Sequence, residues 1–113
     1  MKNYVQISNI IKKFSKVITV QGDKSISIRW ALMASQAVGK SKAYNLLKSE
    51  DVDSTLEALK KLGIKVLKNK KYCEIVGKGL NGFDFKNNTI INAGNSGTLA
   101  RLVLGLLSSS NKS

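Results

Sequence analysis

The chain has 113 residues, of which 42% are apolar and 23% charged, and its formal net charge is +12. This length and apolar content suit one folded domain and exclude a wholly disordered chain. With no His and a single Cys, the sequence also excludes a Ser–His or Cys–His catalytic pair, a Cys/His zinc site and an intramolecular disulfide. The lone Cys favours a reduced, cytoplasmic setting.

The net charge supports two interpretations. A basic chain attracts polyanions, so a small nucleic-acid-binding domain is one hypothesis. All but two of the 19 basic residues are Lys, however, and they are scattered along the chain, which is equally typical of a solvated surface. The few aromatic residues show no base-stacking motif. The longest apolar stretch, residues 102–107, is too short to cross a membrane.

The first half of the chain predicts a strand, a helix and a second strand. Residues 17–20 form a short β-rich run that ends at Gly22. From Lys24 to Val38 the spacing becomes helical, and Gly39 stands where a C-terminal cap belongs. Residues 42–47 read as the next strand. The predicted core-facing stripe of the helix consists of Ile28, Ala31, Leu32, Ser35 and Val38.

The second half predicts a helix, three strands and a last helix. Ser49 is a helix N-cap followed by acidic residues, and the helix ends at Gly63. Strands are expected at 64–67, 72–76 and 89–91, and the last helix at about 95–108. The core face of the first of these helices consists of Val52, Leu56, Leu59 and Leu62. Strands that alternate with helices predict a layered α/β (α+β) fold.

The first candidate site is the start of the helix at Lys24. A helix N-terminus offers unpaired N–H groups and the positive end of the helix dipole to an anion. Lys24 adds a mobile charge, Ser25 a hydroxyl donor, and Arg29 lies one turn later on the same face. This set suits a phosphate, although an ordinary Ser-capped helix start with a surface Lys and Arg would have the same sequence.

The second candidate site is the turn that precedes the last helix. Gly94 and Gly97 leave backbone N–H groups open to a ligand, and Asn95 is a small polar donor beside them. Arg101 follows Gly97 by four residues. An Asn- or Ser-capped glycine turn is the plain alternative.

The positions of the two arginines in the chain support the interpretation of both segments as anion sites. Arg29 and Arg101 each lie one turn into a helix that begins with small polar residues, against a background of Lys. Because the guanidinium group is planar and binds oxyanions through two hydrogen bonds, Arg at these two positions favours phosphate recognition.

Other residues with reactive side chains have simpler explanations. Cys73 lies in a strand pattern and is expected to be a packing residue. The acids Glu50, Asp51 and Asp53 complement a helix dipole more readily than they form a metal or carboxylate-pair site. The segment at 39–41 lacks the upstream glycine of a P-loop, which disfavours a small-molecule kinase.

Three blocks of the sequence resemble one known family. They are GDKSISIR at 22–29, NLLKSED at 45–51 and GNSGTLARL at 94–102, in family order. Together they are similar to the N-terminal part of 5-enolpyruvylshikimate-3-phosphate synthases, over about residues 17–109. The sister enolpyruvyl transferases that act on a UDP-amino sugar have a different Lys-Asn segment at the first block.

The resemblance implies an enzyme of aromatic amino-acid biosynthesis in the shikimate pathway. Such enzymes transfer the enolpyruvyl group of phosphoenolpyruvate to the 5-hydroxyl of shikimate 3-phosphate, release phosphate, and need no metal or organic cofactor. The resemblance also implies a cytoplasmic monomer with small-molecule substrates and no nucleic-acid or membrane partner.

The resemblance assigns roles residue by residue. Lys24 would contact both substrates, while Ser25 and Arg29 would bind shikimate 3-phosphate. The phosphoenolpyruvate pocket would include Asn95 and Gly97, and Arg101 would support the same anionic cleft. No acid–base catalytic residue is assigned to this stretch, so the isolated chain is expected to be inactive.

Two departures from the family pattern stand out. The position before Arg29, commonly His or Asn, is Ile28, which we expect to change packing more than binding. The chain is also much shorter than the two-lobed enzymes, whose lobes are built from repeated βαβαββ units. Residues 1–20 would be an opening strand near the hinge between the lobes, and 21–113 a partial first lobe, truncated at the C-terminus.

Overall fold

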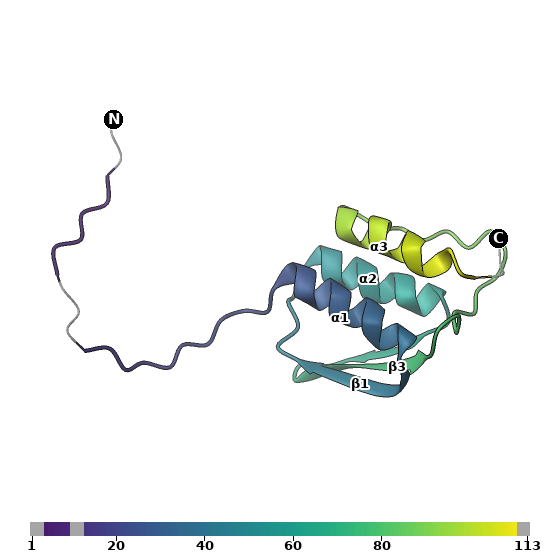
Figure 1. The fold of residues 1–113 in the computed structure, drawn as a ribbon, viewed down its shortest axis with the longest axis horizontal. Coiled ribbons are helices and arrows are strands. Elements are labelled where there is room, and N and C mark those ends of the chain that lie inside the picture. Colours follow the sequence, from purple (N-terminus) through teal and green to yellow (C-terminus); the bar gives the residue numbers. More distant parts are fainter. Residues whose placement is uncertain (1–3, 10–12, 111–113) are drawn as a thin grey trace.

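The computed structural model describes residues 4–9 and 13–110. Three strands form one antiparallel sheet in the order β1-β3-β2, and helices α1 and α2 cover one face of it (Figure 1). Helix α3 lies beside α1 on the side away from the sheet (Figure 1). The elements in chain order are α1 (Lys24–Gln36), β1 (Val38–Tyr44), α2 (Glu50–Lys61), β2 (Lys65–Lys68), β3 (Tyr72–Lys78) and α3 (Gly97–Leu107). The predicted α+β layering is therefore confirmed.

Helix α1 begins after Asp23, whose side chain accepts a hydrogen bond from the Ile26 N–H at 2.7 Å. Four of the five residues predicted on its core-facing stripe are buried. The fifth, Val38, is 90% exposed because the helix ends at Gln36 and the chain turns into β1. Gly39 is accordingly a strand residue, and the C-cap of α1 is Ala37.

Strand β1 starts earlier and ends earlier than the predicted 42–47. Asn45 ends it with a left-handed backbone conformation, at a φ of 56°. The side-chain amide of Asn45 donates a hydrogen bond to the Val20 carbonyl at 2.9 Å, which fastens the segment before α1 to the loop after β1. This polar contact between segments distant in the sequence outweighs the apolar Leu46 and Leu47 that suggested a longer strand.

Helix α2 follows the prediction closely. Ser49 caps it by accepting a hydrogen bond from the Val52 N–H, and all four predicted core residues are buried. The helix ends before Gly63, which has a φ of 80° and leaves no room for a side chain: a Cβ there would lie 2.4 Å from the Asp84 carbonyl oxygen. A glycine is therefore required at this turn.

Strands β2 and β3 form a hairpin, and β3 is the central strand of the sheet. In the turn, Asn69 accepts hydrogen bonds from the N–H groups of Lys71 and Tyr72. Gly77 faces α1 so closely that a Cβ would lie 2.2 Å from the Ala34 carbonyl oxygen. Since alternate strand residues share a face, Cys73 and Ile75 face the same helices and are buried.

Two predicted strands are absent from the described residues. Residues 17–20 and 89–91 have neither helix nor strand structure, and Val17 is 96% exposed. A strand needs a neighbour for its backbone hydrogen bonds, and within 4–9 and 13–110 neither segment pairs with another strand. Residues 13–20 instead run away from the folded body (Figure 1). The described residues contain no helix long and apolar enough to cross a membrane.

Candidate anion-binding site

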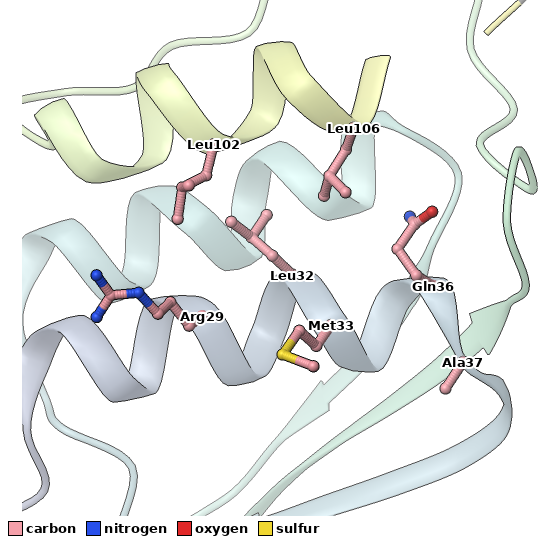
Figure 2. Close-up of a pocket in the computed structure, with 7 residues that line it drawn as sticks. All are labelled: Arg29, Leu32, Met33, Gln36, Ala37, Leu102 and Leu106. Atoms are coloured by element: carbon pink, nitrogen blue, oxygen red, sulfur yellow. The ribbon is translucent and has the colours of Figure 1, made fainter. Parts of the chain in front are cut away.

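The starts of the three helices lie at one end of the molecule. Helices α1 and α3 run side by side in the same direction (Figure 2). The start of α2 is joined to that of α1 by an ion pair between Lys24 Nζ and Asp51 Oδ2 at 3.0 Å. Gly94, in the turn before α3, lies against Ser54 of α2, so that a Cβ on Gly94 would be 2.9 Å from its Oγ. The fold thus brings together two motifs that lie about seventy residues apart, with the positive ends of their helix dipoles at the same place.

The first candidate motif is held by close backbone packing. A Cβ on Gly22 would lie 2.2 Å from the Asn45 carbonyl oxygen, so the turn before α1 is pressed onto the loop after β1. Buried Ser27 accepts a hydrogen bond from the Leu47 N–H at 3.1 Å, which joins the same two segments a second time. These contacts fix the start of α1 against the second of the three blocks named in the sequence, the segment at 45–51.

The three predicted binding residues of this motif lie on the accessible part of α1. Lys24 and Arg29 are exposed, and Ser25 is half-buried. The guanidinium group of Arg29 extends toward the N-terminal end of the helix (Figure 2). The structure therefore places the charged group of Arg29 on the side of α1 from which an anion would approach its first turn.

The second motif is arranged around Gly97. Ser96 is the N-cap of α3, is buried, and accepts a hydrogen bond from the Leu99 N–H at 3.1 Å. Arg101 folds back over the helix start, so that its Nη1 atom would lie 3.4 Å from a Cβ on Gly97. Asn95 is exposed in the turn itself. Helix α3 starts two residues later than predicted because Ser96, rather than Asn95, closes its first turn.

The charges around the two motifs differ. Among the described residues, neither Arg29 nor Arg101 forms an ion pair, whereas Lys24 is paired with Asp51. The nearby Asp53 pairs with Lys68 on β2. Both guanidinium groups are therefore available to a ligand, while the Lys24 ammonium group already has a carboxylate partner.

The reactive-looking residues outside the two motifs have structural roles. Cys73 is 1% exposed, and burial raises the pKa of its thiol above the usual 9.0, which opposes a nucleophilic role and confirms the packing prediction. In the part of the chain that the structure describes, no three His, Cys, Asp or Glu residues gather as metal ligands. Ile28 is fully buried, as its place on the predicted stripe required.

A separate groove runs between α1 and α3 (Figure 2). Its volume is about 440 Å³, and its walls are mostly apolar, with Leu32, Met33, Leu102 and Leu106 along its length. Arg29 stands at the end nearest the helix starts. The apolar walls do not suit a phosphorylated ligand, so the anion-binding candidate is the helix-start end and not this groove.

Comparison with known proteins decides the family. The model of the family described as EPSP synthase (3-phosphoshikimate 1-carboxyvinyltransferase) matches residues 8–113. The chain belongs to the EPSP synthase family. The expected family membership is thereby confirmed, and nothing in the comparisons supports a nucleic-acid-binding protein.

Individual relatives agree with the family match. A 3-phosphoshikimate 1-carboxyvinyltransferase of Syntrophomonas wolfei is 38% identical over 91% of this chain and 24% of its own length. One from Streptococcus uberis is 45% identical over 80% of this chain and 21% of its own. The solved EPSP synthase of Acinetobacter baumannii superposes with a TM-score of 0.75 at 34% identity, covering 82% of this chain and 21% of that protein. The chain thus spans about a quarter of the length of these family members.

Sequence reasoning missed three residues that build the site. Asp23, and not a serine, caps α1; its place three residues before Ile26 is an N-cap signal that could have been used. Ser27 was not singled out, because its partner Leu47 is distant in sequence. The pairing of Asp51 with Lys24 was also missed, since it depends on how α2 lies beside α1.

Proposed function

We propose that this chain forms part of a 3-phosphoshikimate 1-carboxyvinyltransferase. The reaction transfers the enolpyruvyl group of phosphoenolpyruvate to the 5-hydroxyl of shikimate 3-phosphate and releases phosphate, as a step of aromatic amino-acid biosynthesis. The observation that carries the proposal is that the starts of α1 and α3 lie at the same end of the fold, each followed one turn later by an arginine that forms no ion pair with a described residue. A reaction between two phosphorylated substrates needs two neighbouring anion sites, and this end of the fold offers them.

The proposed roles divide between the two motifs. Lys24, Ser25 and Arg29 bind shikimate 3-phosphate, because they offer an ammonium, a hydroxyl and a guanidinium group within the first two turns of α1. Asn95 and Gly97 contact phosphoenolpyruvate together with Lys24. In both cases the N–H groups of a helix start and its dipole stabilise the negative charge.

Arg101 completes the second motif in this proposal. Its guanidinium group lies over Gly97, where it would support the anion held by the turn. The reaction requires no metal or organic cofactor. We further propose a cytoplasmic monomer that acts on small molecules, without a nucleic-acid or membrane partner.

A ligand titration tests the first motif. Shikimate 3-phosphate is titrated into the chain and into the Arg29→Lys and Lys24→Ala variants, with calorimetry or amide NMR shifts as the readout. Arg29→Lys keeps the charge but loses the planar two-bond geometry, so we expect affinity to fall by about tenfold, and Lys24→Ala to reduce it at least as much.

The matched control for this titration is Lys78→Ala. Lys78 is an exposed cation at the C-terminal end of β3, away from the helix starts. Its loss removes the same net charge as Lys24→Ala, and affinity should change less than twofold if the effect is specific. Equal affinities for the wild type and both site variants would contradict the assignment of this motif.

A further inference from the structure

We propose that Asp51 is a positioning residue for Lys24, an inference that rests on the proposed function of the α1 start. The Asp51 carboxylate lies 3.0 Å from the Lys24 ammonium group and comes from a different helix. Its side chain is only 16% exposed, whereas that of Lys24 is 54% exposed. The pair therefore joins a mobile lysine to a largely enclosed carboxylate.

The backbone that carries Asp51 is fixed. The Asp51 carbonyl accepts a hydrogen bond from the hydroxyl of Thr55 at 2.8 Å, and Thr55 is fully buried. The next residue, Val52, is also fully buried, and its N–H is capped by Ser49. Because both neighbours are anchored in the core, Asp51 offers Lys24 a partner whose place does not vary.

A lysine needs such a partner more than an arginine does. Its flexible side chain loses rotamer entropy when it is held in one conformation, whereas the planar guanidinium group of Arg is already pre-organised. If Asp51 already holds Lys24 in its binding conformation in the free protein, part of that entropy is lost before the ligand arrives, and the ligand binds more tightly. Two other nearby acids have different partners, since Asp23 caps α1 and Asp53 pairs with Lys68.

The alternative is that Asp51 only complements the dipole of α2. Asp53 provides the matched control, because it is also an acid in the first turn of α2 and also pairs with a lysine, but one outside the site. Both Asp→Asn substitutions remove one negative charge from this turn. Any effect of the helix dipole or of net charge is therefore shared by the two variants.

The test is the affinity of the chain and its variants for shikimate 3-phosphate. General electrostatics predicts that Asp51→Asn tightens the binding of an anion, since a carboxylate is removed. Positioning predicts the opposite, a weakening of about fivefold, because Lys24 becomes free to move. Asp53→Asn should bind as tightly as the wild type or more tightly, and Asp51→Glu should recover part of the loss.

Two further measurements separate this inference from the proposed function. In a Lys24→Ala background, Asp51→Asn should no longer weaken binding, because the residue through which it acts is gone. The NMR order parameter of Lys24 Nζ should fall in Asp51→Asn and stay unchanged in Asp53→Asn, with no ligand present. Failure of the wild type to bind shikimate 3-phosphate would contradict the proposed function. An unchanged order parameter, or tighter binding by Asp51→Asn, would overturn the positioning role by itself.

Discussion

The starts of α1 and α3 are both turns that contain glycine, but their polar groups are satisfied differently. At α1 a carboxylate, that of Asp23, caps the first turn, and Lys24 is paired with Asp51. At α3 the cap is the neutral and buried Ser96, and Arg101 folds over Gly97 without an acidic partner among the described residues. At α1, therefore, carboxylates are bonded to the first turn and to its lysine, whereas among the described residues no carboxylate is bonded to the cap or to the arginine of α3.

This difference implies that the two motifs bind different ligands. We expect the start of α3 to bind a bare phosphate, because the helix dipole acts there together with a guanidinium group that forms no ion pair among the described residues. At the start of α1 we expect a larger ligand, which Lys24, Ser25 and Arg29 would contact. The glycines of the two turns also differ. Backbone atoms enclose Gly22, whereas only the end of the Arg101 side chain lies near Gly97.

The largest expected effect separates the two glycines. In Gly22→Ala the new Cβ would lie 2.2 Å from the Asn45 carbonyl oxygen and 2.9 Å from the Leu47 nitrogen, both backbone atoms that cannot rotate away. We expect the free energy of unfolding to fall by about 3 kcal/mol, which urea denaturation will measure. Gly97→Ala meets only the flexible end of Arg101 and should unfold like the wild type. Similar losses in both variants would contradict the distinction.

The second prediction concerns inorganic phosphate. We expect amide NMR shifts during a phosphate titration to be larger for the first turn of α3 than for that of α1, because among the described residues no carboxylate is bonded to the cap or the arginine of α3. Arg101→Ala should weaken phosphate binding at α3 by about tenfold, since a charge-assisted contact is lost. Lys78→Ala, which removes the same charge elsewhere, is the control. Stronger binding of phosphate at the start of α1 than at the start of α3 would contradict this prediction.

The third prediction tests the two caps. Asp23→Ala and Ser96→Ala should each destabilise the fold by about 1 kcal/mol, the usual effect of removing a side-chain cap. Their effects on phosphate should differ: Asp23→Ala removes a competing carboxylate and should tighten binding at α1, whereas Ser96→Ala should leave binding at α3 unchanged or weaker. Ser25→Ala, which removes a hydroxyl that caps neither helix, serves as the control in the unfolding experiment.

The sequence predicted what depends on local pattern. The core faces of α1 and α2, the Ser49 cap and the turn at Gly63 all follow from spacing and from single-residue preferences, and all are present except that Val38 is exposed. The four-residue spacing between Gly97 and Arg101 noted in the sequence corresponds in the structure to a guanidinium group that folds back over the glycine.

What failed depends on partners that are distant in sequence. The apolar runs at 17–20 and 89–91 suggested strands, yet β structure forms only where a neighbouring strand accepts the hydrogen bonds. The early end of β1 follows from the contact of Asn45 with Val20, and the pairing of Lys24 with Asp51 follows from the packing of two helices. Neither contact leaves a periodic signal in the sequence.

The smallest expected effect concerns the core that supports both helix starts. Burial raises the pKa of the Cys73 thiol above 9.0 in the folded chain, so above that pH the unfolded chain loses this proton before the folded chain does. The unfolded state is then favoured, and the stability that is present below pH 9.0 falls as the pH rises. Urea denaturation at pH 8 and pH 10 should show this fall, and Cys73→Ala should show less of it.

The same thiol reports on the two glycines: alkylation of Cys73 should be faster in Gly22→Ala than in Gly97→Ala, because only the former loosens the packing beneath α1. Equal alkylation rates would mean that strain at Gly22 is absorbed at the surface and does not reach the core.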